Sequence, residues 1–145
     1  MDYLQMTAPC GLACFKCRYY VGNQDQKKQT KLDRDFRLNG IPPEVWLCNG
    51  CRNQKGVLKS HELFFNRTDP CHVYKCTSEK KIDFCYECSD FPCDHLHPYA
   101  DRADIVPHNT KLFNLCLIKK MGLESWAKEK AAAVHESYFH KWFRL

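Results

Sequence analysis

The stretch APCGLACFKC, residues 8–17, places three cysteines at C-x-x-x-C-x-x-C spacing, Cys10, Cys14 and Cys17. A C-x-x-C pair holds two sulfurs on one tight turn, so that both can face the same ion while backbone N–H groups point at them. The chain contains three such pairs: Cys14/Cys17, Cys48/Cys51 in CNGC, and Cys85/Cys88 in CYEC. One pair alone is a weak signal. Three pairs with four further cysteines in the same region predict a fold organised by bound metal.

These cysteines can be grouped in more than one way. A closed structural zinc site takes four thiolates in a tetrahedron. The most economical grouping gives two sites: Cys14, Cys17, Cys48 and Cys51 in the first, and Cys76, Cys85, Cys88 and Cys93 in the second. Cys10 and Cys71 are then nearby thiols, and either could replace a neighbour. His72, His95 and His97 are alternative donors, although the motif CDHLH favours a helix surface for its histidines. The candidate metal ligands are therefore Cys10, Cys14, Cys17, Cys48, Cys51, Cys71, Cys76, Cys85, Cys88 and Cys93.

The cysteine content also bears on the compartment. The chain has 145 residues, which suits one domain better than two, and eleven cysteines, an odd number. Its first residues, MDYLQMTAPC, show no basic segment followed by an apolar run, and no stretch is apolar enough to cross a membrane. We therefore expect a cytoplasmic protein with no membrane partner, whose reduced cysteines bind metal instead of forming disulfides.

We expect the fold to be a small α-rich (α+β) domain stapled by metal. It is a single domain over residues 1–145, with a metal-binding region of short helices and C-x-x-C turns in 1–98 and a helical C-terminal region in 99–145. The stretch QDQKKQTKLDRDFRLNG predicts a polar helix with Leu32 and Phe36 on its buried side. Asn39-Gly40 predicts the end of that helix.

Further along, Asp69-Pro70 predicts a helix start that places Cys71 in the first turn, and residues 82–84 predict a short strand. In the C-terminal region we expect a helix from Asn109 or Thr110 to Met121, ended by Gly122. A second helix from about Glu124 carries an amphipathic stripe: Ala127, Ala131, Val134, Tyr138, Trp142 and Leu145. Cys116 lies alone on the apolar side of the first of these helices, which favours a small core residue.

Charge is distributed unevenly along the chain. Residues 16–67 carry a net charge of +6, residues 68–105 carry −4, and residues 106–145 carry +4. The basic first half contains Tyr19, Tyr20, Phe36 and Trp46, and aromatics beside Lys and Arg are typical of single-strand nucleic-acid binding. Two alternatives remain, because these aromatics can fill a small core and two four-thiolate zinc sites would lower the total of +5 to about +1.

The first cysteine triplet has the spacing of the cluster motif in radical enzymes that use S-adenosylmethionine. In that family an aromatic residue precedes the last cysteine, whereas here Lys16 takes that place and Phe15 lies one residue earlier. The chain also lacks the length and the βα alternation of their barrel. A plain iron–sulfur cluster remains an alternative, because three close cysteines and a remote fourth can ligate one. No catalytic arrangement of side chains is recognisable, so we do not expect an enzyme.

Four segments together resemble a known family: CGLACFKC, CNGCR, CHVYKCTSEKKIDFCYECSDFPCDHL and KKMGLESW. They are similar in order and spacing to a cysteine-rich prokaryotic family classified only as a domain of unknown function. The resemblance covers nearly the whole chain and implies that all ten candidate ligands belong to the family pattern, whereas Cys116 has no counterpart in it. It implies a metal-binding domain and supplies no reaction.

The function expected from sequence is therefore zinc binding, with two ions, in a module that contacts a protein or a nucleic acid through its basic first half. The alternatives are an iron–sulfur protein with a redox or electron-transfer role, and a metal sensor or carrier.

Overall fold

The computed structural model describes residues 1–96 and 109–140, and almost all regular structure in them is helical. The helices are α1 (Arg18–Gln24), α2 (Gln26–Arg37), α3 (Pro43–Trp46), α4 (Lys59–Phe65), α5 (His72–Lys80), α6 (Thr110–Met121), α7 (Leu123–Glu129) and α8 (Ala131–Phe139), with short 3-10 helices η1 (Cys14–Lys16), η2 (Cys85–Glu87) and η3 (Asp94–Leu96). The described residues form no strand, and their β pairing is one isolated bridge between Thr7 and Ala13. The expected small, α-rich, cysteine-rich fold is confirmed, and the β part of the expectation is not.

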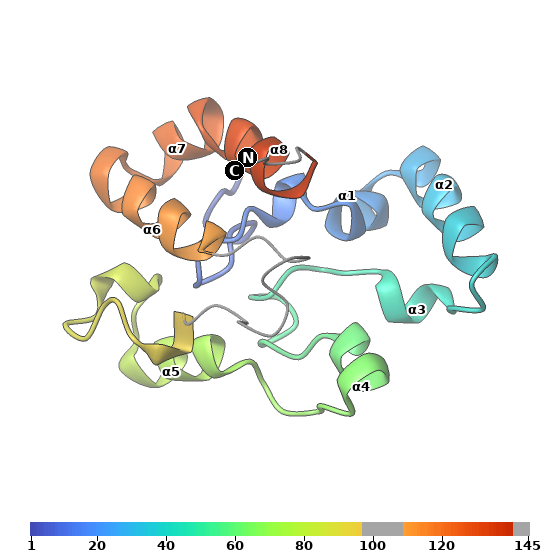
Figure 1. The fold of residues 1–145 in the computed structure, drawn as a ribbon, viewed down its shortest axis with the longest axis horizontal. Coiled ribbons are helices and arrows are strands. Elements are labelled where there is room, and N and C mark those ends of the chain that lie inside the picture. Colours follow the sequence, from blue (N-terminus) through green and yellow to red (C-terminus); the bar gives the residue numbers. More distant parts are fainter. Residues whose placement is uncertain (97–108, 141–145) are drawn as a thin grey trace, which may run out of the picture.

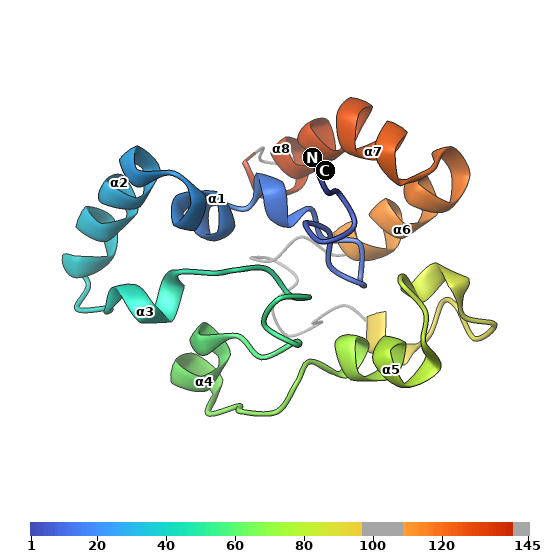
Figure 2. The same cartoon turned by 180° about the vertical axis from the view of Figure 1, so that it is seen from behind.

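The helices gather in two halves around irregular loops (Figure 1). Helices α6, α7 and α8 pack on one another beside the N-terminal segment, and α8 also contacts η1. Helices α1 to α4 follow one another through the other half, and α5 lies across from α6; the view from behind shows the same arrangement (Figure 2). Long loops between short helices therefore carry most of the cysteines.

The main core lies between α6–α8 and the N-terminal turn. Leu115, Ile118 and Trp126 are almost fully buried there. The Trp126 indole N–H donates a 3.2 Å hydrogen bond to Asn114 Oδ1, and its ring meets Phe15 edge to face at 6.0 Å. Because Phe15 sits inside η1, between two cysteines, the C-terminal helices support the first C-x-x-C turn directly.

Gly11 allows this close packing. Its φ is +84°, and a Cβ added there would lie 3.0 Å from both Leu115 Cγ and the Lys111 carbonyl oxygen. A side chain at this position would therefore be strained and would push the turn away from α6. The glycine of the CGL motif brings the cysteine turn against the helical layer.

A second, smaller core holds α1, α2 and α3 together, and the predicted helix over 26–37 is confirmed. The Asp25 carboxylate caps α2 by accepting hydrogen bonds from the backbone N–H groups of Lys27 and Lys28. Leu32 is buried, and Phe36 stacks on Trp46 with ring centroids 5.4 Å apart. The helix ends just before Asn39-Gly40, as expected.

Gly22 in α1 gives the first testable prediction. A Cβ there would overlap Leu32 Cδ1, so Gly22→Ala should destabilise the protein by about 1–3 kcal/mol. At an open helical position the same substitution stabilises by about 1 kcal/mol, so the sign of the effect is diagnostic. Urea unfolding measures it, and adding Leu32→Ala should remove most of the penalty in a double-mutant cycle. A stabilised Gly22→Ala variant would contradict the packing of α1 on α2.

Two local expectations in the cysteine region are wrong. Helix α5 begins at His72 and not at Asp69-Pro70, because Cys71 is extended and its N–H donates to the Gly56 carbonyl at 3.0 Å. Residues 82–84 form no strand, because the Glu87 carboxylate accepts the backbone N–H groups of Asp83 and Phe84 at 3.2 and 3.1 Å. A side chain thus takes the donors that a strand would need.

The C-terminal expectations are confirmed in their main lines. Helix α6 spans Thr110–Met121 with Asn109 as its N-cap, and Gly122 follows with φ +81°. The second expected helix is divided at Lys130 into α7 and α8. The stripe residues Ala127, Ala131 and Val134 are buried and Tyr138 is half-buried, while Trp142 and Leu145 lie outside the described residues.

The expectation that Cys116 is a core residue is wrong. Helix α6 turns Leu115 and Ile118 inward, whereas Cys116 lies on the exposed side. In the part of the chain that the structure describes, no helix is both long enough and apolar enough to cross a membrane.

Candidate metal centre

Four cysteines from three loops pack against the main core, and we call them the inner group: Cys10, Cys14, Cys51 and Cys71. Cys10 is buried and the other three are half-buried. Gly56 joins two of the segments that carry them, since its N–H donates to the Cys51 carbonyl at 2.9 Å and its carbonyl accepts from the Cys71 N–H at 3.0 Å. Residues 20 positions apart in the sequence, Cys51 and Cys71, are therefore held side by side.

Electrostatics confirm that the thiols of the inner group are neighbours. Burial raises the pKa of Cys51 well above its usual range, and the thiols of Cys10, Cys71 and Cys14 raise it further. Burial likewise raises the pKa of Cys14 to about 11 and also raises the pKa of Cys10. These thiols are neutral at pH 7 without metal, so a bound metal ion would displace their protons.

Cys17 and Cys48 form what we call the outer pair, which lies beside Cys14. Burial raises the pKa of Cys48, and the Cys17 thiol acts in the same direction. Cys48 Sγ donates to Gln54 Oε1 at 3.2 Å and accepts the Gly50 N–H at 3.3 Å. The N–H to sulfur bond is the contact expected of a C-x-x-C turn, and Gly50 has φ +86° there.

The inner group differs from the first grouping read from the sequence. The structure places Cys10 and Cys71 beside Cys51, and sets Cys17 with Cys48 to one side. Cys14 stands between the two sets, since after burial the thiols of Cys48, Cys10 and Cys17 all raise its pKa. The family pattern, which includes Cys10 and Cys71, is the sequence signal that pointed to their participation.

The second sequence grouping is brought together by the structure, and we call it the cavity group: Cys76, Cys85, Cys88 and Cys93 line one cavity of about 260 Å³. Cys76 comes from the middle of α5, and η2 carries Cys85 at its start, with Cys88 following. Burial raises the pKa of Cys85 to about 12, with Cys10 and then the three other members of the cavity group adding to the effect. The four thiols therefore share one hollow.

Polar contacts surround the sulfur of Cys88. Lys80 Nζ donates to Cys88 Sγ at 2.9 Å and to Asp90 Oδ2 at 2.8 Å, and the Asp90 N–H points at the same sulfur at 3.4 Å. The expected charge balance between Lys80 and Asp90 is confirmed. Of the alternative donors, His72 and His95 are exposed and stack on each other at 6.0 Å, and His97 lies outside the described residues.

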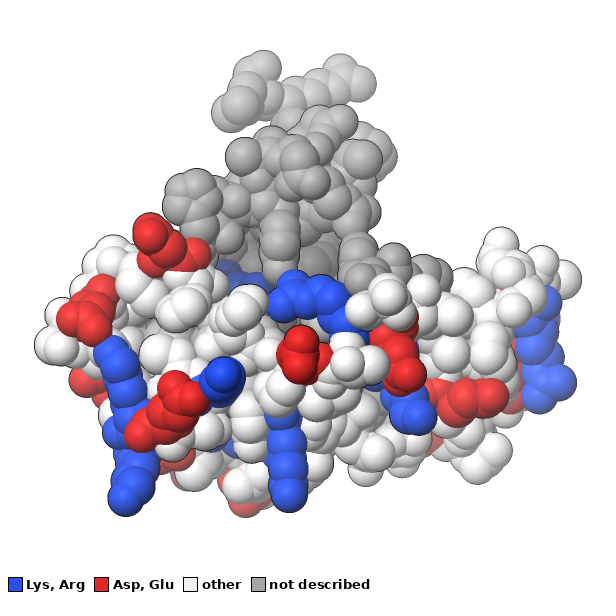
Figure 3. Space-filling view, turned by 90° about the horizontal axis from the view of Figure 1, so that it is seen from below, with Lys and Arg blue, Asp and Glu red and all other residues white. Residues whose placement is uncertain are grey.

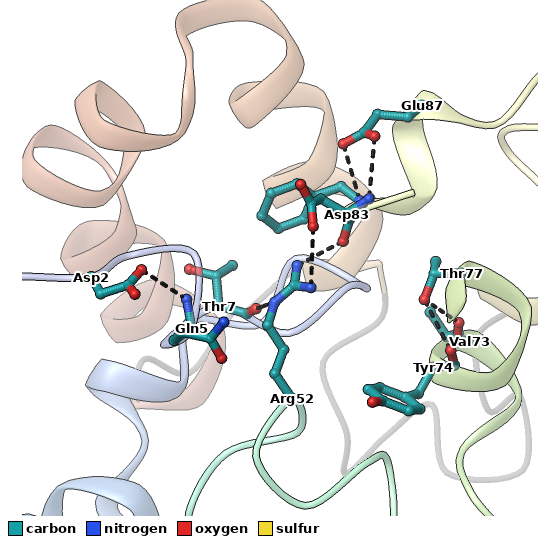
Figure 4. A network of polar contacts seen from close by, with 10 residues as sticks. Asp2, Gln5, Thr7, Arg52, Val73, Tyr74, Thr77, Asp83 and Glu87 are labelled. Carbon is teal, nitrogen blue, oxygen red and sulfur yellow. Dashed lines mark hydrogen bonds and ion pairs between the residues drawn. The ribbon is translucent and has the colours of Figure 1, made fainter. Parts of the chain in front are cut away.

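Arg52 links the segments that carry the two groups (Figure 4). It follows Cys51 directly, and its Nε donates to the Thr7 carbonyl at 2.9 Å. Its terminal nitrogens reach the Asp83 carbonyl at 2.7 Å and the Asp83 carboxylate at 3.7 Å. The guanidinium also lies 5.1 Å from the centre of the Phe84 ring, next to Cys85.

The donor chemistry fits a soft metal. Ten thiols in packed groups are ligands that zinc and iron–sulfur clusters prefer over the oxygen-seeking Mg²⁺ and Ca²⁺. Within residues 1–96 and 109–140, no three Cys, His, Asp or Glu side chains converge closely enough to hold a single ion as they stand. Loading one zinc ion would therefore require the thiols of a group to draw together.

Cys116 supplies a control for these groups. It is exposed on α6, so Cys116→Ser should change the free energy of unfolding by less than about 0.5 kcal/mol and leave metal content unchanged. In the unsubstituted protein Cys116 should be the first thiol to react with a disulfide reagent. Thiol titration with and without a chelator measures this, and simultaneous reaction of the other ten cysteines without chelator would contradict it.

The aromatic residues of the basic first half pack on each other. Trp46 is buried beneath Phe36, Tyr19 lies 5.8 Å from the Phe36 ring, and Arg18 covers both Tyr19 and Phe36. On the face shown in Figure 3, Lys and Arg are interleaved with Asp and Glu. The core-filling interpretation of Phe36 and Trp46 is thus supported.

A family model described as "Protein of unknown function (DUF3795)" matches residues 6–98. The matched segment contains the inner group, the outer pair and the cavity group. No curated protein and no solved structure matches the chain.

Proposed function

We propose that this chain, which belongs to the DUF3795 family of unknown function, is a thiolate-ligated metal-binding protein whose cysteine-rich region folds around the bound metal. The observation that carries the proposal is the gathering of ten cysteines from separate loops into packed groups, while Cys116, outside the family match, lies exposed. Zinc is the ion that we assign to the inner group, because a buried, closed set of four thiolates is the usual structural zinc site.

The metal is proposed to act as a structural staple. The described residues lack a sheet, and the loops around Cys51 and Cys71 are held by few backbone hydrogen bonds. A bound ion would link three loops at once and add its binding free energy to folding. The hydrophobic core alone covers only one side of these loops.

Metal analysis of variants tests this proposal. The full chain is purified without air, and zinc, iron and acid-labile sulfide are measured per chain. We expect bound zinc that Cys51→Ser loses and that the control Cys116→Ser keeps. Protein that stays folded and carries no metal, or equal zinc loss in both variants, would overturn the proposal. A metal that leaves to a mild chelator while the fold persists would instead indicate the carrier or sensor role.

Binding of a polyanion such as a nucleic acid is a second candidate, favoured by one helix face. Lys27, Lys31 and Arg34 are exposed on α2 at a spacing that places them on one side. If they bind phosphates, replacing all three by Gln should lower affinity for single-stranded RNA and flatten its salt dependence. Filter binding at several salt concentrations measures this, with Lys119→Gln/Lys120→Gln on α6 as the control. Equal affinities for both variants would contradict the assignment.

A further inference from the structure

The cavity group has more space between its thiols than one metal ion needs. Zinc–thiolate bonds are about 2.3 Å long, so the sulfurs of a tetrahedral site lie only about 3.8 Å from one another. Such a site leaves no room between its ligands. The four thiols here line a hollow of about 260 Å³, whereas one water molecule in the liquid takes about 30 Å³.

The spacing of the donors agrees with that volume. Cys85 lies within electrostatic range of Cys76, Cys88 and Cys93, so the four sulfurs belong together. Yet among the described residues no three donors converge as a single ion requires. Thiols that share one hollow without meeting at a point are arranged for a ligand larger than an ion.

We infer that the cavity group is a site for an iron–sulfur cluster, bound through Cys76, Cys85, Cys88 and Cys93, and not for a second zinc ion. In a cluster the cysteine sulfurs are spread over two or more iron atoms, which sets them further apart than around one ion. Four cysteines are the ligand set of both [2Fe–2S] and [4Fe–4S] clusters. The inference rests on the proposed metal-binding function and names the cofactor of one of its groups.

The walls of the cavity suit such a group. Val73, Ile82 and Phe91 give it an apolar lining, which limits the access of water to the cluster. Cys76 approaches from α5, while Cys85 and Cys88 approach from one turn and Cys93 follows on the next loop. Ligands on three sides of an apolar hollow can enclose a compact inorganic core.

Lys80 is a positioning and tuning residue for this site. Its ammonium group and the Asp90 N–H both donate to Cys88 Sγ, at 2.9 and 3.4 Å. Hydrogen bonds to ligand sulfurs favour the more negative, reduced state of a cluster and so raise its reduction potential. Asp90 fixes Lys80 in place through the 2.8 Å ion pair.

Anaerobic spectroscopy on the full chain tests the inference. The protein is incubated with ferrous iron, sulfide and thiol, and desalted; iron, labile sulfide, zinc and the visible spectrum are then measured, followed by electron paramagnetic resonance after dithionite reduction. We expect iron and sulfide in cluster stoichiometry, a visible charge-transfer band and a reduced-cluster signal. Cys88→Ser and Cys93→Ser should lose them, whereas Cys17→Ser and Cys116→Ser should keep them.

A variant that folds normally completes the design. Lys80→Met removes one donor to Cys88 Sγ without touching a ligand, so it should shift the midpoint potential to more negative values, while Lys75→Met on the exposed side of α5 should leave it unchanged. One zinc ion per cavity group with no sulfide would overturn the inference and leave the proposed function standing. A cluster that survives Cys88→Ser and Cys93→Ser but is lost in Cys51→Ser would also overturn it. Absence of any bound metal would defeat both proposals.

Discussion

Chelation of the metal under reducing conditions is expected to unfold most of the cysteine-rich region. Structural zinc contributes about 10–16 kcal/mol in small zinc-binding peptides, which is as large as the whole stability of an ordinary domain, about 5–15 kcal/mol. The loops around Cys51 and Cys71 have no strand pairing to replace it. Loss of the metal should therefore cost the protein its fold over residues 1–96 and not only a local contact.

Amide hydrogen exchange measures this effect region by region. After chelation we expect α1, α2, α3 and α5 to lose their protection. The C-terminal helices should retain some, because Leu115, Ile118 and Trp126 pack partly against one another. Restoring zinc or iron and sulfide should restore protection. Unchanged protection in metal-free, reduced protein would show that the core alone maintains these loops.

Replacement of Arg52 has the second largest expected effect. Arg52→Ala removes the hydrogen bonds to the Thr7 and Asp83 carbonyls and the stacking on Phe84, and leaves both carbonyls without that partner. Because the Arg52 side chain is only 14% exposed, these contacts are weakly screened. We expect the free energy of unfolding to fall by about 2–4 kcal/mol in a urea titration of metal-loaded protein.

Arg52→Lys separates geometry from charge. A lysine keeps the positive charge but cannot reach two carbonyls with a planar fork, so it should lose most of the same stability. The exposed Arg37 serves as the control, since Arg37→Ala breaks only an exposed 3.7 Å ion pair with Asp33 and should change stability by less than about 0.5 kcal/mol. Equal urea midpoints for Arg52→Lys and the unsubstituted protein would show that the clamp between Thr7 and Asp83 is not needed.

Features that depend on neighbouring residues could be predicted from the sequence. The cap at Asp25, the buried Leu32, the start of α6 at Thr110 and its end before Gly122 all follow from local signals. The cavity group could also be grouped correctly, because short loops connect its members and leave few alternatives. Local chemistry is enough in these cases.

The inner group could not be predicted in the same way. Its assembly depends on Gly56, which bridges the segments of Cys51 and Cys71 through backbone hydrogen bonds in loops without periodicity. The face of Cys116 also depended on tertiary packing, because α6 carries apolar residues on several sides and the core selects Leu115 and Ile118. The start of α5 moved to His72 because a distant carbonyl holds Cys71 extended.

Native mass spectrometry of the anaerobically purified full chain is the most direct test of the central claim that metal organises this fold. We predict a mass above that of the 17.1 kDa polypeptide under native conditions, with the excess equal to the bound metal, and the bare polypeptide mass after denaturation in chelator. The bare mass under native conditions, from a protein with full helical circular dichroism, would contradict the claim.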